Sequence, residues 1–242
     1  MSILKVKNLD FNYSDKQIIK NLSFSVEKGD FLCIVGTNGT GKSTLIKLIL
    51  NLLKPDSGEI LLYGKDSKNF KQFDKIAYVS QKATNFNAAF PATVEEVVSA
   101  GLYSKNGLFK FKKSTDKQQI KKALDTVGMY DFSKKLIGNL SGGQQQRVFI
   151  AKALVSSPEI IFLDEPTVGI DMKAVDSICC LLGDLNKKHK ITIIMVTHDI
   201  SSILYHANKV LNLSEDGHIR IISAEDYRNE TISEHYRHDK NC

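Results

Sequence analysis

The segment Gly36–Thr44, which reads GTNGTGKST, limits the folds open to this chain more than any other feature. Four residues separate Gly36 from Gly41, and Lys42 and Ser43 follow directly, which is the pattern of a phosphate-binding P-loop. The apolar run FLCIV ends just before the loop, and apolar residues at helical spacing follow it. Because a P-loop lies between a buried strand and a helix, this context predicts a strand–loop–helix unit that binds phosphate.

Each residue type in this loop has a use in phosphate binding. The glycines let backbone amides approach the phosphates closely, and the Lys42 ammonium is placed to reach the β- and γ-phosphates. The hydroxyl of Ser43 is a candidate Mg²⁺ ligand. Many unrelated proteins contain such a loop, so it predicts only binding of ATP or GTP. The candidate phosphate contacts are Gly36, Asn38, Gly39, Gly41, Lys42, Ser43 and Thr44.

Apolar strands alternate with helical segments along most of the chain. This pattern predicts an α/β fold with a mostly parallel sheet covered on both faces. A mainly helical block, from about residue 93 to 154, is inserted between parts of the sheet. A short helix is expected after His198, and a hairpin at Asp216-Gly217. We expect strands at 22–26, 31–35, 60–62, 76–79, 160–163, 191–196, 210–213 and 218–222, and helices at 45–53, 93–98, 120–127, 141–154 and 175–185.

Length and composition are those of a soluble protein with a full hydrophobic core. The chain has 242 residues, of which 42% are hydrophobic, and no apolar run approaches the roughly 18 residues of a membrane span. The first residues contain no apolar signal-peptide core, so we expect an intracellular protein. Four cysteines show no metal-ligand spacing, and Cys33 in the FLCIV run is expected in the core.

The net charge of +6 leaves two interpretations open. Clustered lysines attract anionic lipids or nucleic acid, but they equally occur on solvated loops and helix faces. The cluster consists of Lys110, Lys112, Lys113, Lys117, Lys121 and Lys122.

Four further side chains are candidates for metal binding or catalysis at a bound nucleotide. Asp164 and Glu165 end an apolar strand, where the first carboxylate suits a Mg²⁺ site and the second suits a general base that polarises water. A strand-terminal Asp-Glu pair is also a common loop cap. His198 follows another strand and Gln81 follows a third, and each could instead be a structural or surface residue.

The sequence LSGGQ at Leu140–Gln144 is a second phosphate-binding device. Ser141 can cap the helix that follows, but a cap does not explain Gly142 and Gly143, since glycine disfavours helix by about 1 kcal/mol. We therefore expect another group to approach this backbone closely. The exposed amides and the positive helix end suit a phosphate.

The P-loop followed by LSGGQ resembles the ATP-binding subunit of ABC transporters, and the similarity extends over roughly residues 3–227. The resemblance implies an ABC ATPase fold with an N-terminal antiparallel β region and an inserted helical subdomain at about 83–157. It implies a single domain over residues 1–228, followed by a polar tail at 229–242. It also implies that Mg²⁺ is bound by Ser43, Gln81 and Asp164, and that His198 contacts the γ-phosphate.

In this family the P-loop of one copy faces the Ser-Gly-Gly segment of another. The resemblance therefore implies a homodimer that closes on ATP, with Ser141, Gly142, Gly143 and Gln144 contacting the partner's nucleotide. It places Tyr13 on the adenine ring, although a tyrosine packed on the sheet is the alternative. Asp171 matches an aspartate that transmits changes across this interface. In the loop at residues 168–171, Val168 and Ile170 differ from the residues that the family most often has at these positions.

Spacing narrows the type of ABC ATPase. Lys42 and Ser141 are 99 positions apart, which excludes chromosome-maintenance relatives, because these have a long coiled coil between the two motifs. The chain has one P-loop and one LSGGQ segment and therefore a single ABC ATPase domain. The stretch at residues 87–98, which includes Phe90-Pro91, resembles the corresponding segment of zinc and manganese importers. Iron-chelate importers have a similar sequence in this segment. The resemblance thus implies a peripheral subunit at the cytoplasmic face of the membrane, bound to a separate permease and served indirectly by an extracytoplasmic metal-binding protein.

Two other classes remain as alternatives. One is a soluble ABC-type ATPase without a permease, of the kind that serves iron–sulfur cluster assembly. The other is a nucleic-acid-associated ATPase, which only the positive charge suggests, so no nucleic-acid partner is expected. The irregular spacing of His206, His218, His235, His238 and Cys242 favours surface residues over a metal sensor.

Overall fold

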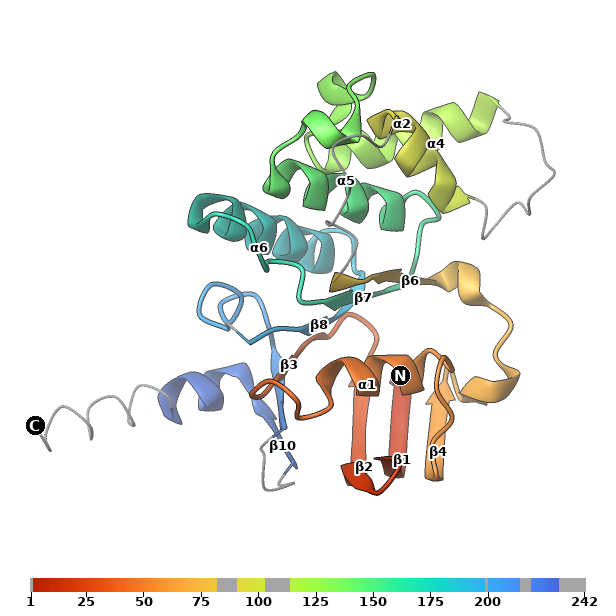
Figure 1. Ribbon diagram of the computed structural model, residues 1–242, viewed down its shortest axis with the longest axis vertical. Helices are drawn as coiled ribbons and strands as arrows, with labels where there is room; N and C mark the ends of the chain where they lie inside the picture. Colours follow the sequence, from red (N-terminus) through yellow and green to blue (C-terminus); the bar gives the residue numbers. More distant parts are fainter. Residues whose placement is uncertain (1, 82–90, 103–113, 199, 214–218, 231–242) are drawn as a thin grey trace, which may run out of the picture. The chain divides into compact units, whose positions relative to one another are not determined.

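The computed structural model describes residues 2–81, 91–102, 114–198, 200–213 and 219–230 (Figure 1). The chain divides into two compact units, and each is described by itself. The first unit contains residues 1–70 and 192–242, and the second contains residues 71–191.

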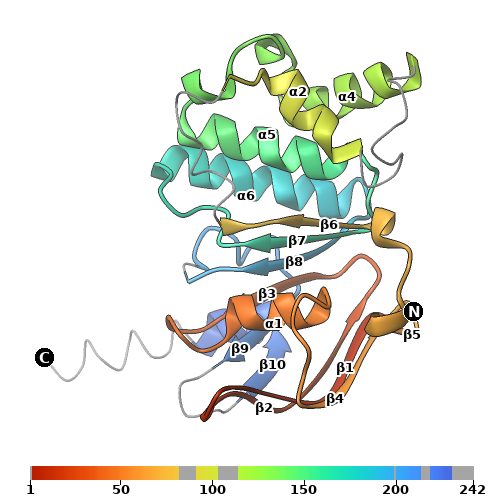
Figure 2. The same ribbon diagram turned by 45° about the vertical axis from the view of Figure 1, so that its right-hand side comes forward.

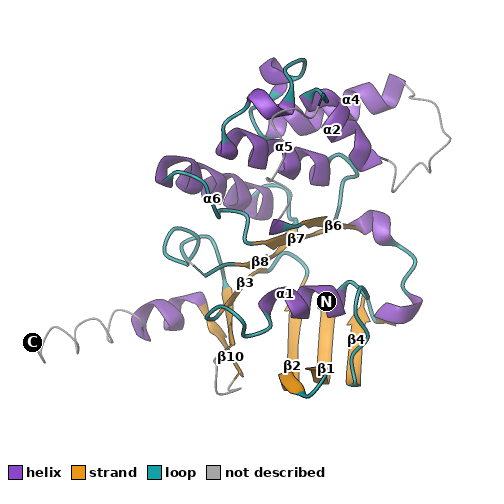
Figure 3. Cartoon of the chain, in the orientation of Figure 1, coloured by secondary structure: helices purple, strands orange, loops and turns teal. Residues whose placement is uncertain are grey.

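Two sheets form the first unit, and Figure 3 shows their strands in orange. One is antiparallel with strand order β2-β1-β4-β5, as expected for the N-terminal region. In the other, β3 pairs in parallel with β8 and β9, while β10 pairs antiparallel with β9. The strands are β1 (Ser2–Tyr13), β2 (Lys16–Glu27), β3 (Phe31–Val35), β4 (Ser57–Leu62), β5 (Lys65–Asp66), β8 (Thr192–Val196), β9 (Lys209–Leu213) and β10 (Ile219–Ser223).

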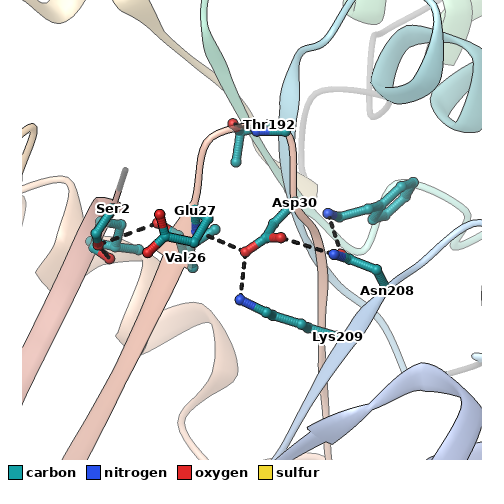
Figure 4. A network of polar contacts seen from close by, with 10 residues as sticks. Ser2, Val26, Glu27, Asp30, Thr192, Asn208 and Lys209 are labelled. Carbon is teal, nitrogen blue, oxygen red and sulfur yellow. Dashed lines mark hydrogen bonds and ion pairs between the residues drawn. The ribbon is translucent and has the colours of Figure 1, made fainter.

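The central strand β3 begins at a buried polar network (Figure 4). One carboxylate oxygen of Asp30 accepts hydrogen bonds from the Glu27 N–H and from Lys209 Nζ, both at 2.7 Å. The other accepts one from Asn208 Nδ2 at 2.8 Å, and Asn208 Oδ1 accepts the Phe31 N–H. Because these bonds join the turn before β3 to the start of β9, they fix the strand that leads into the P-loop.

Helix α1 (Lys42–Ile49) is shorter than expected. The prediction that Leu52 and Leu53 continue the helix was wrong, because the chain leaves it at Asn51, whose φ is 56°. The Asn51 N–H donates to Leu48 O at 3.0 Å, and the Leu52 N–H donates to Lys47 O at 2.8 Å. These bonds form a Schellman motif, in which asparagine takes the left-handed position usually held by glycine.

The described residues of the second unit include the parallel pair of β6 and β7 and the helices α2, α4, α5 and α6 (Figure 2). Helix α5 contacts α2, α4 and α6, and buries residues around most of its circumference. Capping boxes open α2 at Thr93–Glu96, as predicted, and α5 at Ser141–Gln144. The elements are β6 (Ile76–Val79), β7 (Ile160–Asp164), α2 (Val94–Ser99), α4 (Ser114–Thr126), α5 (Gly142–Leu154) and α6 (Met172–Lys187).

Short 3₁₀ turns complete both units: Ser67–Asn69 in the first, and Phe73–Lys75, Ala100–Leu102, Tyr130–Phe132 and Ile137–Asn139 in the second. The short helix expected after His198 is a series of turns, with the Leu204 N–H bonded to Ile200 O at 2.9 Å. Strands β9 and β10 pair as predicted, whereas the Asp216-Gly217 turn lies outside the described residues. Cys33 is buried in β3, as expected.

Candidate functional site

The P-loop is held in a conformation that only glycine adopts without strain. Gly39 and Gly41 have φ values of 90° and 95°. A Cβ on Gly36 would lie 2.3 Å from Leu213 O, and one on Gly41 would lie 2.6 Å from a methyl carbon of Ile18. Two glycines are therefore required by their own surroundings, while Gly39 faces open space and is required for its backbone angle alone.

Lys42 lies across this loop. Its ammonium donates hydrogen bonds of 2.8 Å to Gly36 O and 2.7 Å to Thr37 O, and the residue is only 5% exposed. Helix α1 begins here with no side-chain cap and no acidic residue in its first turn. The first turn therefore keeps its positive helix-dipole character and a lysine next to it, which together suit an anion.

A cavity of about 530 Å³ opens beside the loop within the first unit. The exposed side chain of His198 lines it together with the start of the P-loop, so the structure brings this predicted residue next to the phosphate-binding segment. The Thr197 N–H donates to Ile34 O at 3.1 Å, which anchors the backbone just before His198 to β3. The lining residues are Val35, Gly36, Thr37, Asn38, His198, Ile200, Asn212, Leu213 and Tyr227.

In the second unit, two residues from the end of β6 contact the two carboxylates at the end of β7. Gln81 Nε2 donates a hydrogen bond of 2.8 Å to Glu165 Oε2, and Tyr78 Oη donates one of 3.4 Å to Asp164 Oδ2. Burial raises the pKa of Tyr78 to about 12, and the nearby charge of Asp164 adds to this effect. The phenol therefore stays protonated, and thus a donor, throughout the neutral pH range.

Glu165 has a left-handed backbone, with φ at 48°. This region is unusual for glutamate, and such local strain often occurs at functional sites. Asp164, the residue before it, is 4% exposed, whereas the Glu165 side chain is half-buried. The turn thus separates a buried carboxylate from one that solvent and ligands can reach.

Ser141 caps helix α5 and differs in environment from the glycines that follow. Its Oγ accepts the Gln144 N–H, and Gln144 Oε1 accepts the Ser141 N–H at 3.1 Å. A Cβ on Gly143 would lie 2.6 Å from the Cβ of Ala174, so packing of α5 against α6 explains this glycine. A Cβ on exposed Gly142 would meet no atom closer than 3.6 Å. Packing among the described residues thus accounts for Gly143 but not for Gly142.

Asp171 and Tyr13 have local structural roles as well. Asp171 caps helix α6, where its Oδ1 accepts the Ala174 N–H at 3.0 Å. Tyr13 ends β1 in the first unit and makes an edge-to-face contact with Phe11, with ring centroids 4.8 Å apart. The tyrosine remains 46% exposed, so it both packs on the sheet and leaves ring surface accessible.

The predicted site residues are thus divided between the two units. Tyr13, the P-loop and His198 belong to the first, whereas Gln81, Asp164, Glu165 and Ser141–Gln144 belong to the second. Sequence reasoning missed the contact of Tyr78 with Asp164. An apolar strand that contains one tyrosine gives no sign of it, since the contact depends on the pairing of β6 with β7.

Within the described ranges, no group of three or more His, Cys, Asp and Glu side chains could hold a metal ion by itself. Each unit carries oxygen donors of the kind that Mg²⁺ takes: the hydroxyl of Ser43 in the first, and the side-chain oxygens of Gln81 and Asp164 in the second. Their chemistry fits the ion, because Mg²⁺ is usually held by one or two carboxylates together with water and substrate phosphates. Among the same residues, no helix has the length and apolar character of a membrane span.

The strand–loop–helix of the first unit defines a P-loop nucleotide-binding protein. Comparison with known proteins narrows this class. The model of the ABC transporter family matches residues 19–168. The chain is 45% identical to the zinc uptake system ATP-binding protein ZurA of Listeria innocua, over 99% of this chain and 96% of that protein. It is 40% identical to the manganese transport system ATP-binding protein MntB of Bacillus subtilis, over 86% and 84%.

Solved structures agree with this result. The structure of cbiO1 from Clostridium perfringens, part of the ABC transporter complex cbiONQ, superposes with a TM-score of 0.84 at 32% identity, covering 95% of this chain and 92% of that one. The dimeric bacterial ABC transporter cassette MJ0796 gives a TM-score of 0.77 at 29% identity, covering 91% and 98%.

This chain belongs to the ABC transporter family, as one of its ATP-binding subunits, and it is an ATPase. The expected ABC ATPase fold and the expected similarity to the zinc and manganese importer group are both confirmed.

Proposed function

We propose that this ATPase drives uptake of zinc or manganese ions through a separate membrane permease. The observation that supports this most is the 45% identity to a zinc uptake ATP-binding protein over nearly the full length of both chains. The 40% identity to a manganese transport ATP-binding protein supports manganese as the alternative ion. In this proposal the ion path lies in the permease.

ATP binds at the P-loop in this proposal. Amides from Asn38 to Ser43 surround the phosphates, the Lys42 ammonium moves from its two carbonyl partners to the β- and γ-phosphates, and Tyr13 stacks on adenine. Gly36, Gly39, Gly41 and Thr44 complete these contacts. Ser43, Gln81 and Asp164 would hold Mg²⁺, which would neutralise negative charge on the phosphate oxygens.

Glu165 is the proposed general base. It takes a proton from water, while the water oxygen bonds to the γ-phosphorus and the bond from that phosphorus to ADP breaks. Gln81, which already donates to Glu165 Oε2, orients this carboxylate. His198, which lines the cavity beside the P-loop, donates to the γ-phosphate and helps to orient the water.

Two copies are needed for turnover in this proposal. The exposed Ser141–Gly142 backbone contacts the γ-phosphate held by the P-loop of the other copy, with Gly143 and Gln144 beside it. Among the described residues, no atom lies closer than 3.6 Å to the position that a Cβ on Gly142 would take, which supports this contact. ATP thus closes a symmetric homodimer and hydrolysis opens it. Asp171, at the start of α6, relays this change between copies.

The remaining parts of the proposal concern location and partners. Residues 1–228 form one ABC ATPase domain in which 83–157 is a helical subdomain, and 229–242 is a tail. The subunit lies at the cytoplasmic face of the membrane on its permease, which receives the ion from an extracytoplasmic metal-binding protein. Nucleic acid is not a partner. Of the predicted permease marker at residues 87–98, positions 87–90, which include Phe90, lie outside the described residues.

The proposal can be tested in the organism that encodes the chain. Replacing the chain by its Glu165→Gln variant should lower cellular zinc or manganese under metal limitation, measured by elemental mass spectrometry, and the chain should co-purify with an integral membrane protein. A fall in iron alone would favour an iron-chelate importer. A stable complex with soluble scaffold proteins in place of a permease would contradict the proposal.

A further inference from the structure

Tyr78 contacts the buried carboxylate that the proposed function assigns to Mg²⁺. Its Oη lies 3.4 Å from Asp164 Oδ2, and no sequence pattern gave it a role. We infer that Tyr78 is a positioning residue for ATP hydrolysis, which holds the Asp164 carboxylate in the orientation that metal binding requires. This inference rests on the proposed function of Asp164 and deepens it.

The pairing of two strands explains why a tyrosine at this position reaches the carboxylate. Tyr78 lies opposite Phe162 in the parallel pair of β6 and β7. Alternate residues of a strand point to the same face, so Asp164 lies on the face of Phe162, one step further along. A side chain as long as tyrosine spans this diagonal, whereas a shorter polar side chain would end before it.

A donor on Oδ2 restricts rotation of the carboxylate about its last bond. Asp164 is 4% exposed at the end of a strand whose five residues are all buried, so its orientation is set by protein groups more than by bulk water. Hydrogen bonds to buried charged groups are among the stronger ones in proteins. At 3.4 Å this bond is long, and such bonds commonly shorten in the substrate complex.

Tyr78 also borders a cavity. The residue is half-buried and lines a cavity of about 440 Å³ together with Val79, Ser80, Phe149 and Lys152. Loss of the hydroxyl alone therefore leaves the ring in its place and creates no new void in the core. Tyr78→Phe is consequently a test of the hydroxyl and not of the packing of β6.

The experiment compares three forms of the full-length chain: wild type, Tyr78→Phe, and the control Tyr130→Phe. Tyr130 belongs to the same unit and is 42% exposed, with Lys121 Nζ 5.0 Å from its ring centroid. ATP hydrolysis is measured as a function of ATP and then of Mg²⁺ at saturating ATP. Circular dichroism sets a temperature at which all three forms are folded.

We expect Tyr78→Phe to lower kcat by about fivefold and to raise the Mg²⁺ concentration for half-maximal activity by a similar factor, the size of one lost hydrogen bond. KM for ATP should change little, since the P-loop is untouched, and Tyr130→Phe should match wild type. A purely structural role would alter thermal stability and leave the Mg²⁺ dependence unchanged.

Two results would overturn the inference. One is a Tyr78→Phe variant with wild-type kcat and Mg²⁺ dependence, and the other is a loss of activity that is confined to KM for ATP. If Tyr78→Phe reduces stability, the variant Tyr78→Leu separates the effects, because it should lose more stability but show the same shift in Mg²⁺ dependence. Failure of wild type itself to hydrolyse ATP would instead contradict the function proposed for Asp164 and Glu165.

Discussion

Gln81 Nε2 donates a 2.8 Å hydrogen bond to Oε2 of Glu165, and the two residues are 84 positions apart in sequence. The glutamate has a left-handed backbone, with φ at 48°, so the turn and the amide together fix its carboxylate. Gln81 lies two residues beyond the end of β6, and β6 pairs in parallel with β7, which ends just before Glu165. The pairing of these two strands therefore brings the amide to the proposed base.

Glu165→Gln should retain ATP binding and lose hydrolysis by about 1,000-fold, because an amide cannot accept the proton from water. The variant should remain as an ATP-bound dimer, detected by light scattering with and without ATP. Glu159→Gln, which removes an ion pair with Lys75 in the same unit, is the matched control and should hydrolyse ATP normally. Rapid turnover by the Glu165 variant would exclude it as the base.

Ser141→Arg should bind ATP and fail to hydrolyse it, since the arginine obstructs the site of the partner copy. Lys42→Ala should instead lose ATP binding, because it removes the cation of the P-loop itself. A mixture of the two variants contains dimers with one intact composite site, so part of the activity should return on mixing. If mixing restores nothing although both variants fold, the two segments do not meet across copies.

Adjacent glycines in α5 should respond differently to alanine. Gly143→Ala should destabilise the fold by about 1–3 kcal/mol, since its Cβ would lie 2.6 Å from the Cβ of Ala174. Gly142→Ala should leave the free energy of unfolding almost unchanged, because its Cβ meets nothing closer than 3.6 Å, but lower turnover about tenfold or more. Urea unfolding and ATPase assays separate the two effects, and normal turnover by Gly142→Ala would argue against a phosphate approaching this backbone.

Asp30 should make stability depend on pH in the acid range. Burial by itself raises its pKa, but hydrogen bonds from Lys209, Asn208 and the Glu27 N–H outweigh burial and hold the pKa below the ordinary value of 3.8. Since the folded-state pKa is the lower one, this contribution is present above pH 3.8 and is lost as the pH falls through the folded-state pKa.

Asp30→Asn should therefore lower the free energy of unfolding by about 2 kcal/mol at pH 7. The difference from wild type should shrink at lower pH, as the wild-type carboxylate becomes protonated. Urea unfolding at several pH values measures it, with Asp15→Asn in the exposed turn between β1 and β2 as the control. A constant difference at every pH would show that the ionised carboxylate is not the cause.

Elements with local signals could be predicted from the amino-acid sequence. The five apolar residues before Gly36 form β3 within the predicted bounds, and Thr93 and Ser141 cap helices as their spacing indicated. Each of these features depends on residues within a few positions of each other, so propensity and hydrogen bonding along the chain suffice. The order of the P-loop and the LSGGQ segment likewise identified the family from sequence.

Contacts between residues far apart in sequence, and the reason that some residues are required, became known from the tertiary structure. It showed that packing against Ala174 explains Gly143, whereas no described residue lies close enough to explain Gly142, and that Tyr78 reaches Asp164. It also ended α1 at Ile49, where a left-handed Asn51 turns the chain away from further helix. These outcomes follow from close packing and strand pairing between segments far apart in sequence, and no local pattern encodes them.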